Sequence, residues 1–195
     1  SDPVATWAPG VAAAGTVGSV EWDGTIGGAP APEGLYEFRV VVSPQQQSAS
    51  AARAGTPSAR SRFRLLAHRF PIAGPHTYGE GFGASRGDRA HQGQDVLAAC
   101  GTPVAAAIGG KVKQVAYQER AGNYVVIAGD DGFDHAYLHL QQPSPLVKGA
   151  RVGTGDPVGA VGETGRASGC HLHFELWAAP GWYTGGQPVD PLPHL

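Results

Sequence analysis

The sequence has little charge of either sign and no long apolar run. Charged residues make up 15% of the 195 residues, and the net charge is -2 with a pI near 6.4. This balance argues against nucleic-acid binding through a basic field. Because no stretch of about 18 apolar residues occurs, we predict no membrane span. The chain also begins without Met, so we expect that a signal or upstream segment of an exported protein has been removed or left out.

Cysteine is scarce: only Cys100 and Cys170 are present, and they form no C-x-x-C motif. That absence argues against a thiolate zinc knuckle and a thioredoxin-type redox site. An even pair suits one disulfide in an exported protein, and two buried free thiols are the alternative. We favour the disulfide, because both cysteines flank clusters of histidines that must come together.

The many glycines and prolines between short apolar runs indicate β structure. Hydrophobic residues are 42% of the chain, which indicates a folded protein, and 30 glycines with 16 prolines are spread between short apolar runs. Helical periodicity is nearly absent. Beyond residue 62 we predict strands at 63–67, 103–108, 111–117, 123–128, 134–140, 157–161 and 171–177, with a long glycine-rich loop over 74–90 that rims a site.

The chain divides into three parts by composition. Residues 1–43 contain strand patterns at Ser19–Trp22 and Leu35–Val42, and the Trp22-Asp23-Gly24 turn with the strand after it resembles the end of an immunoglobulin-like module. We expect a partial immunoglobulin-like β segment that serves as a spacer. Residues 44–62 are rich in Ser, Ala, Gln and Arg without apolar periodicity, which predicts a linker. The second domain is predicted over 63–195.

Histidines gather at three places in the second domain. His91 and Asp95 are four residues apart, with Gly93 between them favouring a bent segment. In 134–140, period-2 alternation places His135, Tyr137 and His139 on one strand face. In 171–177, the same alternation places His171, His173 and Glu175 on one face, opposite Leu172, Phe174 and Leu176. For His171 and His173 alone, the alternative is a half-exposed strand that carries incidental histidines.

Imidazoles and a carboxylate suit a hydrolytic zinc better than a structural one. Three N/O ligands with an open position are typical of catalytic zinc, whereas structural zinc takes four protein ligands, mostly cysteines. A bound water would be the nucleophile, and spare histidines beside it could take its proton. Glu175 is predicted to support the ligands rather than act on the substrate.

Six motifs in fixed order carry a family resemblance over about 70–195. They are His91-x3-Asp95, Thr102–Ala106 with Gly110–Val112, Gly122–Ile127, Tyr137–Leu140, Val147 through Gly165, and His171–Glu175. The set closely resembles the lysostaphin/LytM-type zinc metallopeptidases, which cut peptide bonds in bacterial peptidoglycan. The resemblance implies an all-β, two-layered antiparallel fold with a groove, and secreted or cell-envelope action.

The same resemblance assigns roles to residues. One Zn²⁺ per chain would be held by His91, Asp95 and His173, with His139 and His171 as the catalytic histidines beside a metal-bound water. Tyr137 matches an aromatic position of the family. His135 departs from the usual apolar or aromatic residue and receives no role, and His68, His76 and His194 are predicted to lie on the surface or the groove rim.

The predicted function is therefore a zinc-dependent endopeptidase acting on peptidoglycan peptides. The alternative is a non-catalytic member that binds the cell wall or activates a partner hydrolase. A polysaccharide-binding or structural β domain with incidental histidines is the third hypothesis. The choice of scissile bond is open, because the loops over 74–90 and 141–149 would set it.

Overall fold

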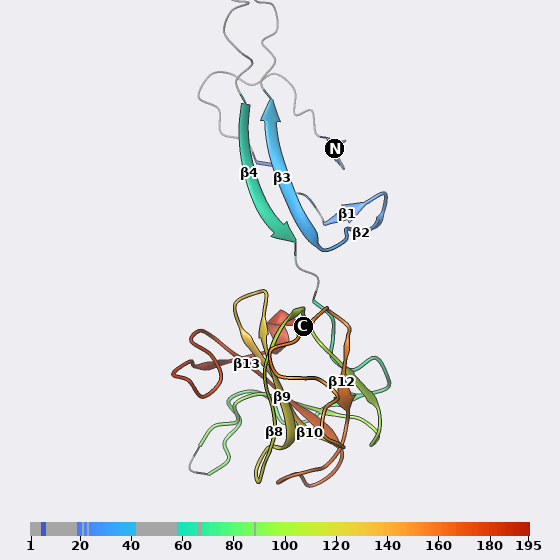
Figure 1. Ribbon diagram of the computed structural model, residues 1–195, viewed down its shortest axis with the longest axis vertical. Coiled ribbons are helices and arrows are strands. Elements are labelled where there is room, and N and C mark those ends of the chain that lie inside the picture. Colours follow the sequence, from blue (N-terminus) through green and yellow to red (C-terminus); the bar gives the residue numbers. More distant parts are fainter. Residues whose placement is uncertain are drawn as a thin grey trace, which may run out of the picture. The chain divides into compact units, whose positions relative to one another are not determined.

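The computed structural model describes residues 5–6, 19–20, 22, 24–41, 58–65, 68–87 and 89–195 (Figure 1). The chain forms two compact units, Ser1–Leu65 and Leu66–Leu195. Nearly all regular structure is β-strand, and the one helix in the described part is the short 3-10 turn η1 (Leu192–His194). No helix among the described residues is long and apolar enough to cross a membrane.

The first unit is built from two hairpins. β1 (Thr25–Ile26) pairs with β2 (Ala29–Pro30), and β3 (Gly34–Val41) pairs antiparallel with β4 (Ser58–Leu65). The rings of Trp22, Tyr36 and Phe63 form its aromatic cluster, with centroids 5.1–6.1 Å apart.

Strand β4 crosses the boundary that the sequence suggested at residue 62, so residues 58–65 belong to the first unit. The sequence predicts a strand only at 63–67 and assigns it to the second domain. Residues 58–62 are missed because they are Ser, Ala and Arg, and 59–62 are exposed. Glu37 on β3 forms ion pairs with Arg39 of the same strand and with Arg60 and Arg62 across on β4. The rest of the predicted linker and Glu21 in the predicted strand 19–22 lie outside the described residues, and the immunoglobulin-like assignment stays a prediction.

The second unit is organised around one large antiparallel sheet. Its order is β11-β8-β9-β10-β13-β6-β5, with β14 pairing with the far end of β13. The strands are β5 (Thr77–Tyr78), β6 (Gln94–Leu97), β8 (Gly110–Gln118), β9 (Gly122–Gly129), β10 (Asp134–Leu140), β11 (Arg151–Val152), β13 (His171–Trp177) and β14 (Pro188–Val189). The observed bounds of β10 and β13 are those predicted from alternation alone.

A second, smaller sheet covers one face of the large one. It consists of β7 (Pro103–Ala105) and β12 (Pro157–Ala160). The main core contains Val104 and Val158 from this layer together with Val125, Tyr137 and Phe174 from the large sheet. The two-layered all-β prediction is confirmed, and the opposite face of the large sheet carries the site.

A disulfide joins Cys100 and Cys170, as predicted. Their Cα atoms are 5.3 Å apart and 70 residues separate them in the sequence. Cys100 follows β6, and Cys170 directly precedes β13. The cross-link therefore ties together the two strands that carry the aspartate and the histidine pair.

His135 belongs to a buried ion-pair cluster away from the site. Its Nε2 lies 2.9 Å from Asp131 Oδ2, and the exposed His68 contacts the same oxygen at 3.1 Å. Burial opposes ionisation of Asp131, but the hydrogen bonds from His135 and His68 outweigh it and lower the pKa from 3.8 to about 2.

We expect Asp131→Asn to destabilise the second unit in a pH-dependent way. A carboxylate with a lowered folded-state pKa stabilises fully above its unfolded value, and that contribution is lost as the pH falls through about 2. The difference in unfolding free energy should be about 2 kcal/mol above pH 4 and shrink towards pH 2. Denaturant unfolding at pH 2 to 6 measures it, and a difference independent of pH would contradict the assignment.

Candidate active site

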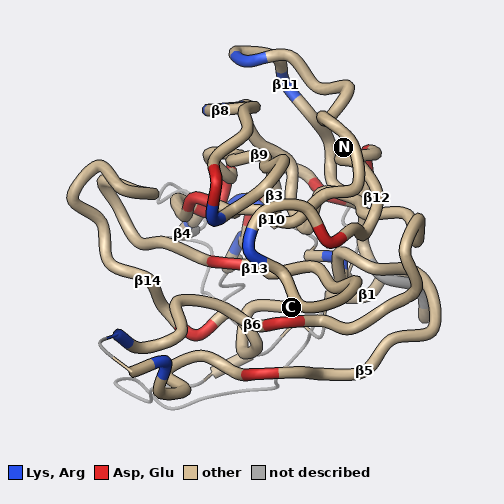
Figure 2. Tube along the Cα trace, turned by 90° about the horizontal axis from the view of Figure 1, so that it is seen from below, with Lys and Arg blue, Asp and Glu red and all other residues tan. Residues whose placement is uncertain are grey.

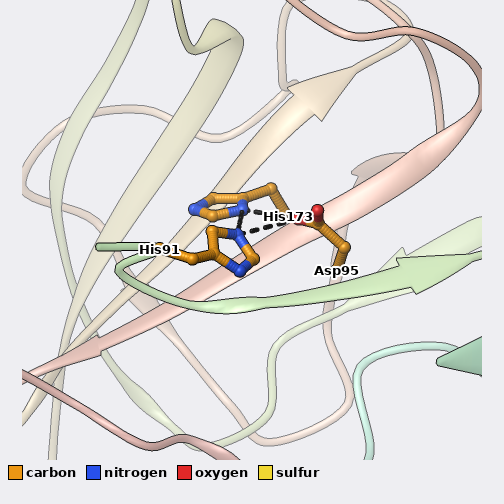
Figure 3. A group of neighbouring side chains, drawn as sticks. All are labelled: His91, Asp95 and His173. Carbon is orange, nitrogen blue, oxygen red and sulfur yellow. Dashed lines mark hydrogen bonds and ion pairs between the residues drawn. The ribbon is translucent and has the colours of Figure 1, made fainter. Parts of the chain in front are cut away.

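The register between β13 and β6 creates the centre of the site. His173 stands directly opposite Asp95 in this antiparallel pair. His91, in the bent segment before β6, folds its ring against His173 with the centroids 4.7 Å apart (Figure 3). His173 Nδ1 lies 2.7 Å from Asp95 Oδ1 and 2.9 Å from His91 Nε2, and His91 Nε2 lies 3.2 Å from Asp95 Oδ1. Three donor atoms therefore converge on one point, and all three residues are buried.

The remaining ring nitrogens orient the two imidazoles. His91 Nδ1 donates to the carbonyl oxygen of Gly81 at 2.9 Å, which turns Nε2 towards the centre. His173 Nε2 donates to Glu175 Oε1 at 2.9 Å, which turns Nδ1 the same way. Two histidines and a carboxylate held in this manner are the donor set of a catalytic zinc, so the residues fit such an ion.

The charges of the centre are tightly coupled. Burial opposes the charged form of His173, but hydrogen bonds to Asp95 and Glu175 outweigh burial and raise its pKa to about 9. Burial also opposes ionisation of Asp95, and the hydrogen bonds from His173 and His91 hold its pKa well below the ordinary value. His173 thus carries a proton that a metal ion would displace on binding.

Glu175 is a buried support for His173, as the sequence suggested. Its Oε1 accepts from His173, while Oε2 accepts the indole N–H groups of Trp177 and Trp182 at 2.8 and 2.7 Å. Burial opposes its charge, and these donors lower the pKa of Glu175 below the usual range. The carboxylate is therefore fully used within the protein, so it is not offered to the substrate.

Asp95 has a second partner that the sequence did not predict. Its Oδ2 accepts from Arg86 at 2.8 Å, and Arg86 Nε donates to Glu80 at 2.6 Å. The arginine comes from the long glycine-rich loop over 74–90, and no motif links it to the aspartate. This contact fixes the carboxylate so that Oδ1 faces the two histidines.

His139 reaches the site because β10 breaks its alternation. The pairing of β10 with β9 shifts register between Tyr137 and Leu140, and His139 has a left-handed backbone with φ 61°. The prediction that His139 shares a face with His135 and Tyr137 is wrong. Those two point into the core, where Tyr137 OH accepts the Ala107 N–H at 2.8 Å, while His139 lies against His171 on the other side.

His139 and His171 form a second pair of imidazoles beside the first. Their ring centroids are 4.7 Å apart, and His139 lies 5.9 Å from His173. His139 Nδ1 donates to Thr164 O and His171 Nδ1 donates to Gly169 O, both at 2.8 Å. Each Nε2 is thereby left as the nitrogen that faces away from the backbone. Burial lowers the pKa of His139 to about 4, against the opposing hydrogen bond to Thr164, so this imidazole is neutral at neutral pH.

The other histidines lie apart from these four. His68, His76 and His194 are exposed: His68 contacts Asp131, His76 stacks on Phe70, and His194 lies against Phe133. His135 Nδ1 is a buried nitrogen without a hydrogen-bond partner in the described part of the chain. None of the four lines the groove described next.

An open groove of mixed polarity runs over His91, His139 and His173, and an adjoining hollow contains His171. Its wall near His91 and His173 includes Trp182 and Tyr183 from the loop before β14, and its far wall comes from the turn between β8 and β9. His139 lines this groove and the adjoining hollow that contains Asp95 and His171. Acidic and basic residues are both spread over the molecule as a whole (Figure 2).

A family model and several known proteins are similar to this chain. The model described as Peptidase family M23 matches residues 89–191, just over half of the chain. The peptidoglycan DD-endopeptidase ShyC of Vibrio cholerae is 46% identical over 89 residues, which are 45% of this chain and 20% of the relative. ShyA of the same organism is 41% identical over 102 residues, which are 52% of this chain and 22% of the relative. The chain thus spans about a fifth of the length of these curated relatives.

Solved structures resemble the second unit in fold. A zinc-containing peptidase from Vibrio cholerae aligns with a TM-score of 0.58 and 29% identity, covering 66% of this chain and 42% of that one. The catalytic domain of lysostaphin from Staphylococcus simulans aligns with a TM-score of 0.56 and 27% identity, covering 61% of this chain and 91% of that one. The likeness agrees with the resemblance seen in the motifs.

Proposed function

Because the chain belongs to peptidase family M23, we propose that its second unit is a zinc-dependent endopeptidase that hydrolyses peptide bonds in bacterial peptidoglycan. The observation that carries this proposal is the convergence of His91, Asp95 and His173 beside the pair His139 and His171 in one groove. A non-catalytic wall-binding role is not favoured, since the donor set and both additional histidines are complete. The first unit would act as a spacer.

One zinc ion per chain would be held by His91 Nε2, Asp95 Oδ1 and His173 Nδ1. When bound, zinc polarises the scissile carbonyl and activates water for attack at neutral pH. Arg86 and Glu175 hold the outer atoms of two of these ligands, which keeps the donors in place.

The two further histidines would handle protons. His139 is neutral at neutral pH, and its free Nε2 can accept a proton from the attacking water. His171 Nε2 lies 3.7 Å from Asp95 Oδ1, close to the centre. In the doubly protonated form of this ring, with Nδ1 still bonded to Gly169 O, the Nε2–H would donate to the developing oxyanion or pass its proton to the leaving amine. The carbonyl oxygens of Thr164 and Gly169 fix the tautomer of both rings, so that each Nε2 is available to the substrate.

The curated relatives are named as peptidoglycan DD-endopeptidases. We take from them the substrate, a cross-linked cell-wall peptide, and the place of action, the cell envelope. The wide groove over the centre suits a peptide that enters as an extended strand.

Cleavage of defined cross-linked muropeptides by the zinc-loaded chain tests this function. Mass spectrometry should identify monomeric products, and removal of zinc by a chelator should stop their release. The proposal fails if the protein holds one zinc per chain and still releases no product from muropeptides or from purified wall.

We expect Glu175→Gln to weaken zinc binding by about 10- to 100-fold. The amide cannot provide the charge that favours His173 with its proton on Nε2, so Nδ1 becomes a poorer ligand. Competition with a fluorescent chelator gives the dissociation constant. Glu33→Gln, in the first unit, is the matched control, and an unchanged constant in Glu175→Gln would contradict the supporting role.

A further inference from the structure

Arginines are concentrated in the groove over the catalytic centre. Four of them line it, Arg86, Arg89, Arg120 and Arg166, and no lysine does. The lining contains one acidic residue, Glu175, whose carboxylate is occupied by His173 and two indoles. The whole chain has a net charge of -2, so this positive charge is a local property of the groove.

Three of these arginines, Arg89, Arg120 and Arg166, have guanidinium groups available to a ligand, and the last two are joined through their backbones. Arg86 is bound to Glu80 and Asp95 and is thereby used within the site. Arg120 is exposed and forms no ion pair with any residue that the structure describes. Arg166 pairs with Glu119 at 2.8 Å, but the two side chains are 65% and 81% exposed, and such a surface pair is weak and exchangeable.

Arg120 and Arg166 are held next to each other by their backbones. Arg166 N–H donates to the carbonyl oxygen of Arg120 at 3.0 Å. Gly122 and Gly165 have left-handed φ of 66° and 78°, and a Cβ at Gly165 would overlap the backbone nitrogen of Gly122. The turn before β9 and the loop before β13 therefore approach more closely than side chains would permit.

The same pair of loops orients the catalytic histidine. Thr164 Oγ1 accepts the Asn123 N–H at 3.0 Å and donates to Leu140 O at 2.7 Å, while Thr164 O accepts from His139 Nδ1. Arg120 and Arg166 thus project from the platform that fixes His139. The backbone positions of these two residues relative to His139 are set by the contacts of Thr164 and of Arg166 N–H.

We propose that Arg120 and Arg166 form a carboxylate-binding subsite that selects cell-wall peptides with a free carboxylate near the scissile bond. This inference rests on the proposed function. Two guanidinium groups suit a carboxylate, which accepts paired N–H donors, and offer no equivalent partner to an amidated peptide or a neutral glycyl bridge. The subsite therefore acts on the choice of substrate rather than on the chemical step.

A matched pair of cross-linked muropeptides tests the subsite, one with free carboxylates and one with the same groups amidated. The zinc-loaded full chain should cleave the free form with a kcat/KM about 10- to 100-fold higher, the range expected for charge-assisted hydrogen bonds. Arg120→Gln with Arg166→Gln should bring this ratio close to one, mainly through KM. Zinc content and melting temperature should be unchanged.

The controls separate this inference from the proposed function. Arg151→Gln removes an exposed arginine that pairs with Asp130 outside the groove, and it should keep the wild-type ratio. If the double Gln variant unfolds, the double variant Arg120→Lys, Arg166→Lys is used in its place. It keeps the charge but loses the paired N–H donors, so it should lower the ratio of kcat/KM between the free and amidated peptides only in part. Equal cleavage of both peptides by wild type, with no effect of the variants, overturns the subsite and leaves the peptidase intact.

A binding measurement tests the carboxylate-binding subsite independently of turnover. Calorimetric titration of the free-carboxylate stem peptide into the wild-type protein should give tighter binding than the amidated peptide, and the double Gln variant should lose that difference. Absence of cleavage with this binding difference present would sink the proposed activity while keeping the subsite. If neither cleavage nor the binding difference is observed, both the proposed activity and the subsite are wrong.

Discussion

His173→Ala is expected to lose both zinc and cleavage, whereas His139→Ala should lose cleavage alone. His173 provides one of the three converging donors, and loss of even an outer partner of a ligand costs 10- to 100-fold in metal affinity, so loss of the ligand itself should exceed about 100-fold. His139 donates its Nδ1–H to Thr164 and contributes no donor to the centre, so its removal should lower kcat by about 10²- to 10⁴-fold.

Zinc content by elemental analysis and turnover of one cross-linked muropeptide measure the two effects separately. His171→Ala should behave like His139→Ala. His194→Ala is the control, because this histidine is exposed and lies against Phe133 outside the groove. Loss of zinc in His139→Ala would show that the ligand and proton-transfer roles have been exchanged.

Removing the disulfide is expected to cost about 4 kcal/mol of unfolding free energy. A cross-link that closes a loop of about 70 residues lowers the chain entropy of the unfolded state by roughly this amount. Because Cys100 follows β6 and Cys170 precedes β13, the same change should loosen the register that sets Asp95 against His173. Zinc affinity should therefore fall along with stability.

Denaturant unfolding of the Cys100→Ala, Cys170→Ala double variant, with and without zinc, measures both consequences. Wild-type protein under a reducing agent should move towards the variant, while the variant itself should not respond. Stability that falls with no change in zinc affinity would show that the disulfide braces the unit but leaves the metal donors unaffected.

Most of the site could be predicted from residue order, because strong alternation defines β10 and β13 and places His171, His173 and Glu175 on one face. The structure places Asp95 opposite His173 through a short strand, β6, that the sequence did not predict. Three of its four residues are buried, so it has no alternation to detect. The ligand and catalytic roles themselves await the experiments above.

Each of the errors has its own physical cause. A period-2 pattern assumes an unbroken strand, and the left-handed backbone of His139 violates that assumption without any glycine or proline to signal it. The first five residues of β4 are Ser, Ala and Arg, so their composition resembles a linker although the backbone is fully paired with β3. Arg86 reaches Asp95 through a loop conformation that no short motif encodes.

The placement of β13 in the sheet has a consequence for the timing of activity. β13 lies between β10 and β6, and His173 follows Asp95 by 78 residues along the chain. Until β13 is synthesised and inserted, β6 has only the two-residue β5 as a partner in the sheet, and the donors cannot meet. A nascent or truncated chain that stops before His173 therefore cannot bring the three donor atoms together.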